Sequence, residues 1–283
     1  MGGEPVRFTK MHGTGNDFVV IEDIDGSIPE EEFSGLANRL CDRRFGIGAD
    51  GLILVLPSRE ADFKMRIFNA DGSEAEMCGN GIRCFAKYLR SEGLTDKKSL
   101  NIETKAGLIK PEIVSDGRLG ALVKVDMGSP KLEREEIPMI GKPGKVINEL
   151  ININGLEFRV TCVSMGNPHC VIFVDDLDSI PLTSLGPQIE NSPLFPARTN
   201  VEFVQILGRN ELKMRVWERG AGETLACGTG ACASAVAAFL NKKTGRKVTV
   251  HLPGGDLLVE WADDDRVFMT GPAVMVFSGY LYS

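Results

Sequence analysis

The sequence has no surplus of basic charge and no basic stripe with interleaved aromatic residues. Its 283 residues include 32 Lys or Arg against 39 Asp or Glu, a formal net charge of −7. Nucleic acids and anionic membrane surfaces both select basic faces on their partners. We therefore expect neither nucleic acid nor membrane as a partner.

Long hydrophobic runs are also missing. The longest apolar run, ACASAVAAFL, is about half of the roughly 20 residues that a membrane-spanning helix needs. The first residues, MGGEPVRFTKMHG, lack the apolar core of a signal peptide, so we expect a cytoplasmic protein. The seven cysteines are odd in number, and a chain of this size needs no disulfides, which predicts thiols in a reducing compartment.

Helical patterns are few, and most of the chain predicts strands. Short β-branched or alternating segments bounded by Gly, Asp or Pro recur along both parts of the sequence. One surface helix is predicted within 29–44, and two more follow Cys78 and Cys227. The last of these is apolar on all sides except Ser234, which is typical of a helix buried all round. The stretch 128–149, rich in Pro, Gly and charge, predicts a linker.

The chain also contains an internal repeat. Cys78 and Cys227 lie 149 positions apart, and each is followed by Gly-x-Gly and a helical run. RIFNADGSE precedes the first cysteine and RVWERGAGE the second at the same offset. Gly-Asn pairs end at Asn16 and Asn167, an offset of 151, and ADGLILV lies opposite TNVEFVQ at an offset of 150.

Four segments in one order at nearly one offset indicate a duplicated domain. We therefore predict an α+β fold of two pseudo-symmetric halves, each a strand-rich, barrel-like sheet wrapped around a central helix. The predicted halves are 1–128 and 129–271, and the final strand, about 272–283, returns to the first half. We expect the active site in the cleft between them.

A cysteine at a helix N-terminus has a chemical use. The unpaired amides and partial positive charge there lower the pKa of a thiol from about 8.5, and they also bind carboxylate or phosphate. Two such sites facing one cleft would present two thiols to one substrate. Inversion at a carbon next to a carboxylate needs a base on one face, an acid on the other, and amide donors for the developing charge. The sequence thus favours a racemase or epimerase.

Four blocks of the sequence resemble one family. MHGTGNDFVVI, FNADGSEAEMCGNGIRC, SMGNPHCVIFV and ERGAGETLACGTGACAS are similar to the signature blocks of the diaminopimelate epimerases, in order and across nearly the whole chain. The resemblance implies an isomerase that interconverts LL- and meso-diaminopimelate, a step toward lysine and peptidoglycan. It also implies activity without pyridoxal phosphate, metal or other cofactor, and a homodimer.

The resemblance also implies residue roles. Cys78 and Cys227 would be the two acid/base thiols, and His169 and Glu218 would tune their pKa values. The implied substrate-binding residues are Asn16, Asn69, Gly79, Asn80, Asn167, Asn200, Glu218, Arg219, Gly228 and Thr229. Glu218 and Arg219 would meet the distal amino acid end of the substrate. One departure is Gly51, where some relatives carry Gln.

Structural roles compete with these assignments. Cys41, Cys84, Cys162, Cys170 and Cys232 are expected to be small buried hydrophobes. Arg66 and Arg215 are expected in structural ion pairs, His169 could be a satisfied core group, and Asn16 and Asn80 could be turn residues. A zinc site is disfavoured because zinc ligands favour two short Cys-x₂₋₄-Cys pairs, whereas here helix is expected between Cys78 and Cys84 and between Cys227 and Cys232. GTGACA fits a dinucleotide fingerprint but no βαβ unit surrounds it.

Three other functions remain open. A proline or hydroxyproline racemase shares the two-cysteine plan, but its first block typically has His where this chain has Asn80, and its second lacks ERGAGE. A phenazine-biosynthesis-type isomerase shares the fold but not the cysteine pair. A redox-sensing or ligand-binding module could form a reversible disulfide, and it would not exchange a substrate Cα hydrogen with solvent.

Overall fold

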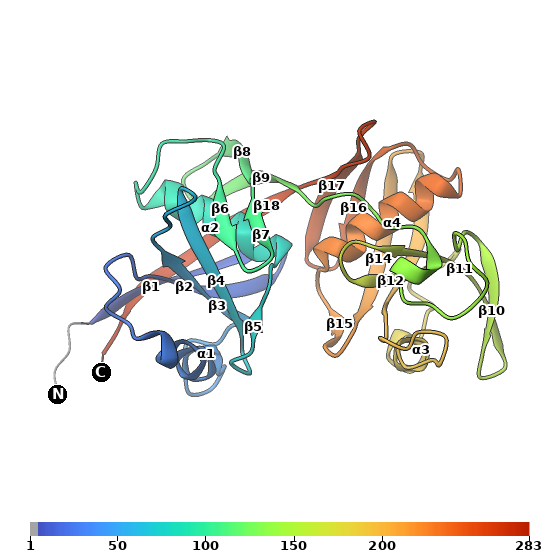
Figure 1. The fold of residues 1–283 in the computed structure, drawn as a ribbon, viewed down its shortest axis with the longest axis horizontal. Coiled ribbons are helices and arrows are strands. Elements are labelled where there is room, and N and C mark those ends of the chain that lie inside the picture. The colour runs from blue at the N-terminus through green and yellow to red at the C-terminus, as the bar shows by residue number, and fades with distance from the viewer. Residues whose placement is uncertain (1–4, 283) are drawn as a thin grey trace. The chain divides into compact units, whose positions relative to one another are not determined.

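The computed structural model describes residues 5–282 and divides the chain into two compact units (Figure 1). Unit 1 comprises Met1–Val125 with Gly271–Ser283, and unit 2 comprises Asp126–Thr270. Each unit is rich in strands and contains one long internal helix and one shorter helix. The predicted α+β class is confirmed.

Unit 1 holds nine strands, two α-helices and a 3₁₀ turn among its described residues. The strands are β1 (Val6–Gly13), β2 (Asn16–Glu22), β3 (Gly51–Leu56), β4 (Phe63–Asn69), β5 (Glu74–Ala75), β6 (Ile102–Thr104), β7 (Gly107–Ile109), β8 (Glu112–Asp116) and β9 (Gly120–Asp126). The helical segments are the 3₁₀ turn Glu30–Glu32, α1 (Phe33–Cys41) and α2 (Gly79–Ser91). Pairing is antiparallel for β1–β2, β3–β4 and β6–β7, and parallel for β2–β3 and β4–β6.

Unit 2 repeats this pattern. Its strands are β10 (Glu149–Ile153), β11 (Leu156–Ser164), β12 (Pro168–Phe173), β13 (Asn200–Gly208), β14 (Glu211–Glu218), β15 (Gly222–Thr224), β16 (Lys247–Leu252) and β17 (Gly255–Trp261). The helical segments are the 3₁₀ turn Arg134–Glu136, α3 (Leu182–Glu190) and α4 (Gly228–Leu240). Pairing is antiparallel for β11–β12, β13–β14 and β16–β17, and parallel for β12–β13 and β14–β16.

The two units therefore have the same topology, which confirms the predicted duplication. Leu52 pairs with Phe68 in unit 1, and Val201 pairs with Trp217 in unit 2, so both strands are related by 149 positions. The offset of 150 predicted for the β3 and β13 segments was wrong by one residue. The corrected register makes Ile53 the equivalent of Glu202.

One long strand belongs to both units. The first residues of β18 (Val267–Leu281) pair with β17, and its later residues pair with β1 from Val6↔Leu281 to His12↔Val274. The last strand of the chain thus completes the sheet of the first unit. Figure 1 shows it as the red strand that ends beside the N-terminal strand.

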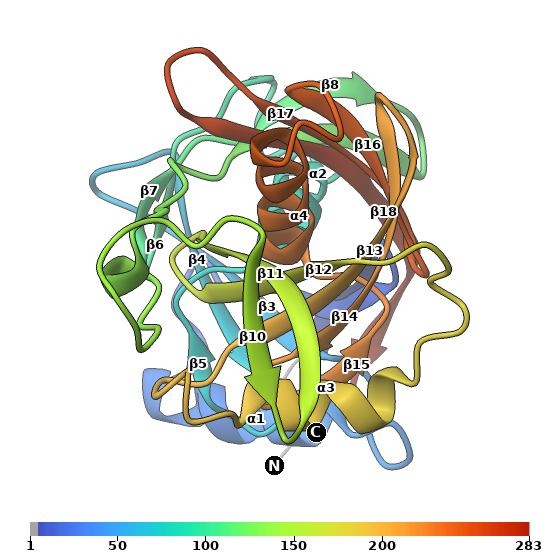
Figure 2. The same ribbon diagram turned by 90° about the vertical axis from the view of Figure 1, so that its right-hand side faces the viewer.

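The two long helices lie inside their sheets. In α4 every residue from Ala231 to Ala238 is buried, and the helix contacts strands β11 to β14, β16 and β17 (Figure 2). Small side chains suit this position because they let strands approach the helix from several sides. The prediction of a helix buried all round is confirmed. The helix α2 is also buried from Asn80 to Leu89, although it carries Arg83 and Lys87.

The parallel strands of unit 1 are buried on both faces. The side chains of Val19, Ile21, Leu52 and Leu54 share a core cluster with α1, while α2 also contacts β2 and β3. This double coverage explains the continuous apolar runs FVVI and LILV, because a strand covered on both faces has no solvent side for polar residues. The beginning of β2 lies beside the start of α2, since Asn80 donates to Asn16.

One helix was missed and one linker prediction was wrong. The helix α3 contains Gly186 and Pro187, which resemble a turn in the sequence. A Cβ at Gly186 would lie 2.4 Å from the Trp217 ring, so only glycine lets α3 pack there.

The predicted linker 128–149 packs into unit 2, because Ile137, Met139 and Val146 are buried in its core.

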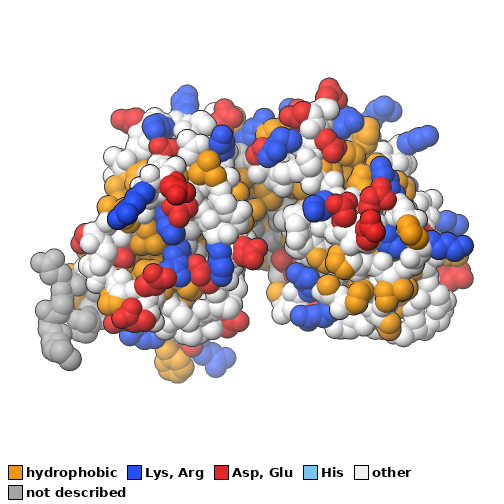
Figure 3. All heavy atoms as spheres, viewed as in Figure 1, with side chains coloured by type: hydrophobic (Ala, Val, Ile, Leu, Met, Phe, Trp, Pro, Cys, Tyr) orange, Lys and Arg blue, Asp and Glu red, His pale blue; other side chains and the backbone are white. Residues whose placement is uncertain are grey.

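The surface agrees with the modest net charge. On the face in Figure 3, acidic and basic side chains are interspersed on each unit. Among residues 5–282, no helix is long and apolar enough to span a membrane.

The buried small-residue face of α4 generates a stability prediction. Replacing Ala233 by Leu forces extra methylenes between helix and strands, and we expect the free energy of unfolding to fall by about 1–3 kcal/mol. Arg39→Leu, on the exposed face of α1, is the control and should change it by less than about 0.5 kcal/mol. Urea denaturation followed by circular dichroism measures both. Equal effects would mean that α4 is not tightly enclosed.

Candidate active site

Each long helix begins with a cysteine that caps it. The Cys78 sulfur accepts a hydrogen bond from the Gly81 amide at 3.4 Å, and the Cys227 sulfur accepts one from the Gly230 amide at 3.3 Å. Both cysteines have extended backbone, as N-cap residues do. The next amides, of Ile82 and Ala231, donate to the carbonyl oxygens of Cys78 and Cys227 at 2.8 and 2.9 Å. Each of the two predicted helices therefore has a cysteine sulfur at its N-terminus.

In unit 1 two asparagines surround the thiol of Cys78. That thiol donates to Asn16 Oδ1 at 3.6 Å, and Asn80 Nδ2 donates to the same oxygen at 3.2 Å. Asn16 Nδ2 in turn donates to Asp50 Oδ2 at 2.7 Å. The structure thus brings together three of the predicted site residues, and it adds Asp50, which orients Asn16.

A tight turn holds this cluster in place. Thr14 and Gly15, with φ angles of 53° and 83°, connect β1 to β2 immediately before Asn16. Positive φ is uncommon for a β-branched residue. Thr14 Oγ1 donates to Asn80 Oδ1 at 3.3 Å and accepts from Arg83 Nη2 at 3.3 Å. Thr14 and the buried Arg83 were not predicted as site residues, because nothing in the sequence shows that Arg83 points back to the helix start.

The site of unit 2 is more enclosed. Cys227 is 5% exposed, and its sulfur lies 3.5 Å from Thr229 Oγ1. Burial, followed by the neighbouring carboxylates of Glu218 and Glu202, raises the pKa of Cys227 well above its usual value. The predicted lowering of the pKa is therefore wrong for this cysteine. Desolvation and the two acidic neighbours outweigh the hydrogen bonds from Thr229 and the Gly230 amide, which act to lower the pKa.

Glu218, the last residue of β14, is an acidic neighbour of Cys227. Burial raises the pKa of its carboxyl, and hydrogen bonds from Thr224 and Cys227 partly oppose that effect. Cys227 and Glu218 thus interact directly. The short strands β14 and β15 position this group, because Glu218 pairs with Gly222 at the turn between them.

His169 and Asn167 extend the Cys227 site. Asn167 Nδ2 donates to Thr229 Oγ1 at 3.2 Å, and Asn167 Oδ1 lies 3.0 Å from His169 Nε2. His169 Nδ1 lies 2.6 Å from Glu202 Oε1, and both side chains are fully buried. Sequence reasoning missed Glu202; the signal was an acidic residue inside the apolar strand NVEFVQIL.

Asn200 and Arg219 lie at the ends of neighbouring strands. Asn200 Nδ2 donates to the Pro168 carbonyl at 2.8 Å, and Asn200 Oδ1 accepts from the Arg219 amide at 2.9 Å. Arg219 is exposed, and its Nη1 donates to the Ala197 carbonyl at 3.0 Å. Asn200 thus ties the chain before His169 to the turn that carries Arg219.

Asn69 and Gly51 pair at the end of the β3–β4 ladder. Asn69 is exposed and donates to Ser73 Oγ at 2.9 Å, within its own turn. A Cβ at Gly51 would lie 2.7 Å from the Phe68 carbonyl oxygen. A larger residue at this position would therefore require a backbone shift. This close contact explains why the position is occupied by glycine.

The arginines and cysteines that were expected to have structural roles form ion pairs or are buried. Arg66 pairs with Glu74, and Arg215 pairs with Glu223, in the same position of each unit. The side chains of five other cysteines are 2% exposed or less: Cys41, Cys84, Cys162, Cys170 and Cys232. Both structural predictions are confirmed.

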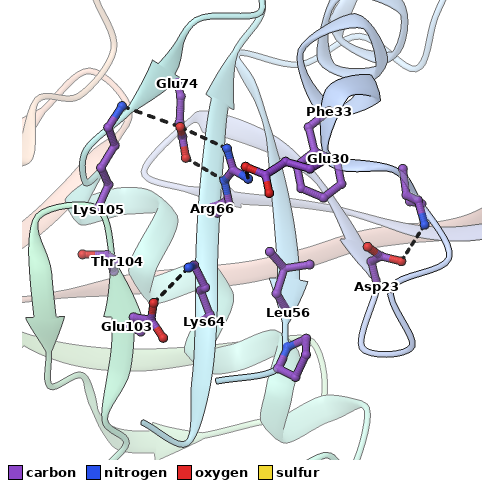
Figure 4. A pocket seen from close by; sticks show the side chains of 13 residues that line it. Asp23, Glu30, Phe33, Leu56, Lys64, Arg66, Glu74, Glu103, Thr104 and Lys105 are labelled. Carbon is purple, nitrogen blue, oxygen red and sulfur yellow. Dashed lines mark hydrogen bonds and ion pairs between the residues drawn. The ribbon is translucent and has the colours of Figure 1, made fainter. Parts of the chain in front are cut away.

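A hollow of about 590 Å³ lies in unit 1 around Arg66 (Figure 4). Its charged lining residues pair with one another, as in Arg66 with Glu74 and Lys64 with Glu103. Cys78, Asn16 and Asn80 do not line it. The hollow therefore contributes ion pairs rather than chemistry. Within residues 5–282, no group of three or more His, Cys, Asp or Glu side chains is arranged to hold a metal ion.

Solved structures with the same fold come from several isomerase-related groups. A phenazine biosynthesis protein of the PhzF family from Bacillus anthracis aligns with a TM-score of 0.72 at 19% identity, over 99% of each chain. A hydroxyproline epimerase from Agrobacterium vitis aligns with a TM-score of 0.66 at 17% identity, over 99% of this chain and 92% of its own. Fold and site together define a duplicated α+β protein with one cysteine-capped helix in each unit.

Sequence comparison then identifies the family. The family model described as diaminopimelate epimerase matches residues 8–133 and 161–276. A diaminopimelate epimerase from Moorella thermoacetica is 60% identical over 275 residues, 97% of this chain and 98% of its own. One from Pelotomaculum thermopropionicum is 59% identical over the same shares of the two chains. The chain belongs to the diaminopimelate epimerase family.

The electrostatics at Cys227 generate a prediction. Glu218→Gln removes a negative neighbour that raises the pKa of Cys227, so the pKa should fall and more thiolate should be present at a given pH. Alkylation of Cys227 by iodoacetamide, followed by mass spectrometry across a pH series, should then reach half-maximal rate at a lower pH. Glu211→Gln, an exposed carboxylate on the same strand, should leave the profile unchanged. An unshifted profile in the Glu218 variant would contradict the coupling.

Proposed function

We propose that this chain interconverts LL- and meso-diaminopimelate by a two-base mechanism without a cofactor. The observation that carries the reaction class is the repeated helix with a cysteine sulfur that accepts from an amide of its first turn, once at Cys78 and once at Cys227. The substrate follows from the curated diaminopimelate epimerases, which are 54–60% identical over nearly the whole chain.

The mechanism requires both thiols to act on opposite faces of one substrate carbon. In one direction the Cys78 thiolate takes the Cα proton and becomes a thiol. The Cys227 thiol delivers its own proton to the other face and becomes a thiolate. Bonds and charge balance, and the reverse reaction exchanges the two roles. The raised pKa of Cys227 supports its protonated starting state.

The helix starts would hold the reacting carboxylate. The first N–H groups of an α-helix have no intrahelical carbonyl to donate to, and N–H donors at a helix start stabilise charge that develops on a carboxylate. We assign this role to Gly79, Asn80, Gly228 and Thr229. Further substrate contacts are assigned to Asn16, Asn69, Asn167, Asn200, Glu218 and Arg219, with His169 and Glu218 tuning the thiols.

The setting of the enzyme is part of the same proposal. We propose a cytoplasmic homodimer in lysine and peptidoglycan precursor synthesis, with functional halves at 1–128 and 129–271 and the strand at about 272–283 belonging to the first. The compact units and the pairing of β18 with β1 support this division.

Proton NMR of the reduced protein in deuterium oxide tests the reaction. With LL-diaminopimelate we expect loss of the Cα signal and the appearance of the meso isomer, and with L-proline we expect no loss. Exchange with proline alone would assign the chain to the racemases, and exchange with neither would favour a sensor or binding module.

Single cysteine variants are the control for that experiment. Cys78→Ala and Cys227→Ala should each lower inversion by at least about 100-fold, because each face loses its own proton-transfer group. Circular dichroism should show an intact fold in both. Substantial inversion in either variant would contradict the two-base assignment.

The distal contact generates a separate prediction. Arg219→Ala should weaken diaminopimelate binding by about 10- to 100-fold, because a hydrogen bond to a charged group contributes about 1.5–3 kcal/mol. The side chain is exposed, so unfolding should change little. Calorimetric titration measures the affinity, with Arg209→Ala, exposed in the same unit, as the matched control. Unchanged affinity would remove Arg219 from the substrate site.

A further inference from the structure

Glu202 is a buried acid at a position where the same fold accepts an apolar residue. The ladder pairs Glu202 with Val216 in unit 2 and Ile53 with Ile67 in unit 1, so Ile53 is its equivalent. The parallel neighbours give a second correspondence, because His169 pairs with Asn200 and Phe18 pairs with Gly51. An apolar pair, Phe18 and Ile53, thus occupies in unit 1 the place of His169 and Glu202.

Packing alone does not explain the acid. Glu202 is 0% exposed, and its Oε2 has no hydrogen-bond partner in residues 5–282. Burial of a carboxylate costs several kcal/mol unless a countercharge and hydrogen bonds compensate it. Unit 1 shows that the fold forms without that cost. The carboxylate therefore has a role that the apolar pair of unit 1 does not perform.

The carboxylate lies against the first turn of α4. A Cβ on Gly230 would come within 2.8 Å of Glu202 Oε1, so the glycine permits this close approach. The equivalent Gly81 instead has Ile67 and Ile53 as neighbours. Glu202 thus lies beside the residue whose amide caps Cys227.

A continuous hydrogen-bond chain leads from Glu202 to the thiol. Glu202 Oε1 is 2.6 Å from His169 Nδ1, and His169 Nε2 is 3.0 Å from Asn167 Oδ1. Asn167 Nδ2 is 3.2 Å from Thr229 Oγ1, which lies 3.5 Å from Cys227 Sγ. Every link joins two residues of unit 2.

The chain places an oxygen acceptor beside each nitrogen of the imidazole. His169 Nδ1 lies beside the Glu202 carboxylate and Nε2 lies beside the Asn167 amide oxygen, an arrangement in which a proton on each ring nitrogen would have an acceptor. If the ring carried one proton, on Nδ1, then Nε2 would accept. The Asn167 amide would rotate to present Nδ2 to the ring, and it would no longer donate to Thr229.

Other charged and titratable groups surround this pair. Cys170 and His169 come from β12, Glu218 from β14, and Cys227 from the start of α4. The Glu202 charge acts on three of them, since it raises the pKa of Cys170, Glu218 and Cys227. Glu202 therefore acts on the Cys227 thiol in two ways, through the hydrogen-bond chain and through its charge.

We propose that Glu202 is a positioning residue of the Cys227 site, which keeps His169 doubly protonated and thereby holds Asn167 and Thr229 in place beside the thiol. It touches no substrate atom itself. The inference rests on the proposed function for its consequence in catalysis, but its structural part concerns His169 alone.

Nitrogen-15 NMR of histidine-labelled protein tests that structural part without substrate. The chain has three histidines, His12, His169 and His251, and His169→Phe assigns the signal of interest. In the native protein at pH 7 we expect protons on both His169 ring nitrogens. Glu202→Gln keeps an acceptor for Nδ1 but removes the charge, and it should convert the ring to the neutral form.

Kinetics with diaminopimelate test the catalytic part. Glu202→Gln and Glu202→Ile should lower kcat by about 10- to 100-fold, as loss of an outer partner of a site residue does, with a smaller effect on KM. Asp23→Asn, a buried carboxylate changed to an amide in unit 1, is the matched control and should change neither the His169 spectrum nor kcat.

The outcomes separate the two proposals. A native protein inactive on diaminopimelate would overturn the proposed function, while the His169 spectrum would still decide the role of Glu202. A single ring proton on His169 in the native protein would overturn the positioning role, even if the variants fail to fold. A native-like kcat in folded Glu202→Gln would overturn it as well.

Discussion

The structure depends on the capping of a buried helix by a sulfur atom. A helix inside a sheet cannot satisfy its first amides with water, so an acceptor must stand at its N-terminus. Here the acceptor is Cys78 in one unit and Cys227 in the other. The same requirement places a thiol at the start of each buried helix. The fold needs a hydrogen-bond acceptor at the start of each buried helix, and the proposed chemistry needs a thiol there. One cysteine meets both requirements.

Duplication supplies two such positions, and divergence makes them different. In unit 1 asparagine side chains surround the thiol, and the core behind them is apolar, with Phe18 and Ile53. In unit 2 that core pair is His169 and Glu202, and the thiol is buried among acidic groups. One topology therefore holds two electrostatic environments.

The fold by itself does not identify the reaction. Proteins named for phenazine biosynthesis and for hydroxyproline epimerisation share it at 17–19% identity. The discriminating features are local, namely the two capping cysteines, the asparagines beside them and the turn that carries Glu218 and Arg219. These agree with the family assigned from the whole chain.

The sequence by itself determined the duplicated, strand-rich fold, the two cysteine-capped helices and the family, because repeats, periodicity and capping residues are local signals. It did not reveal α3, whose Gly186 and Pro187 resemble a turn until Trp217 packs on them. Nor did it reveal that the pKa of Cys227 is raised, because burial and the carboxylates of Glu218 and Glu202 outweigh the helix end. Glu202 and His169 lie 33 positions apart, and only the parallel pairing of β12 with β13 brings their side chains together. Contacts of this kind depend on the register between strands, which tertiary structure decides.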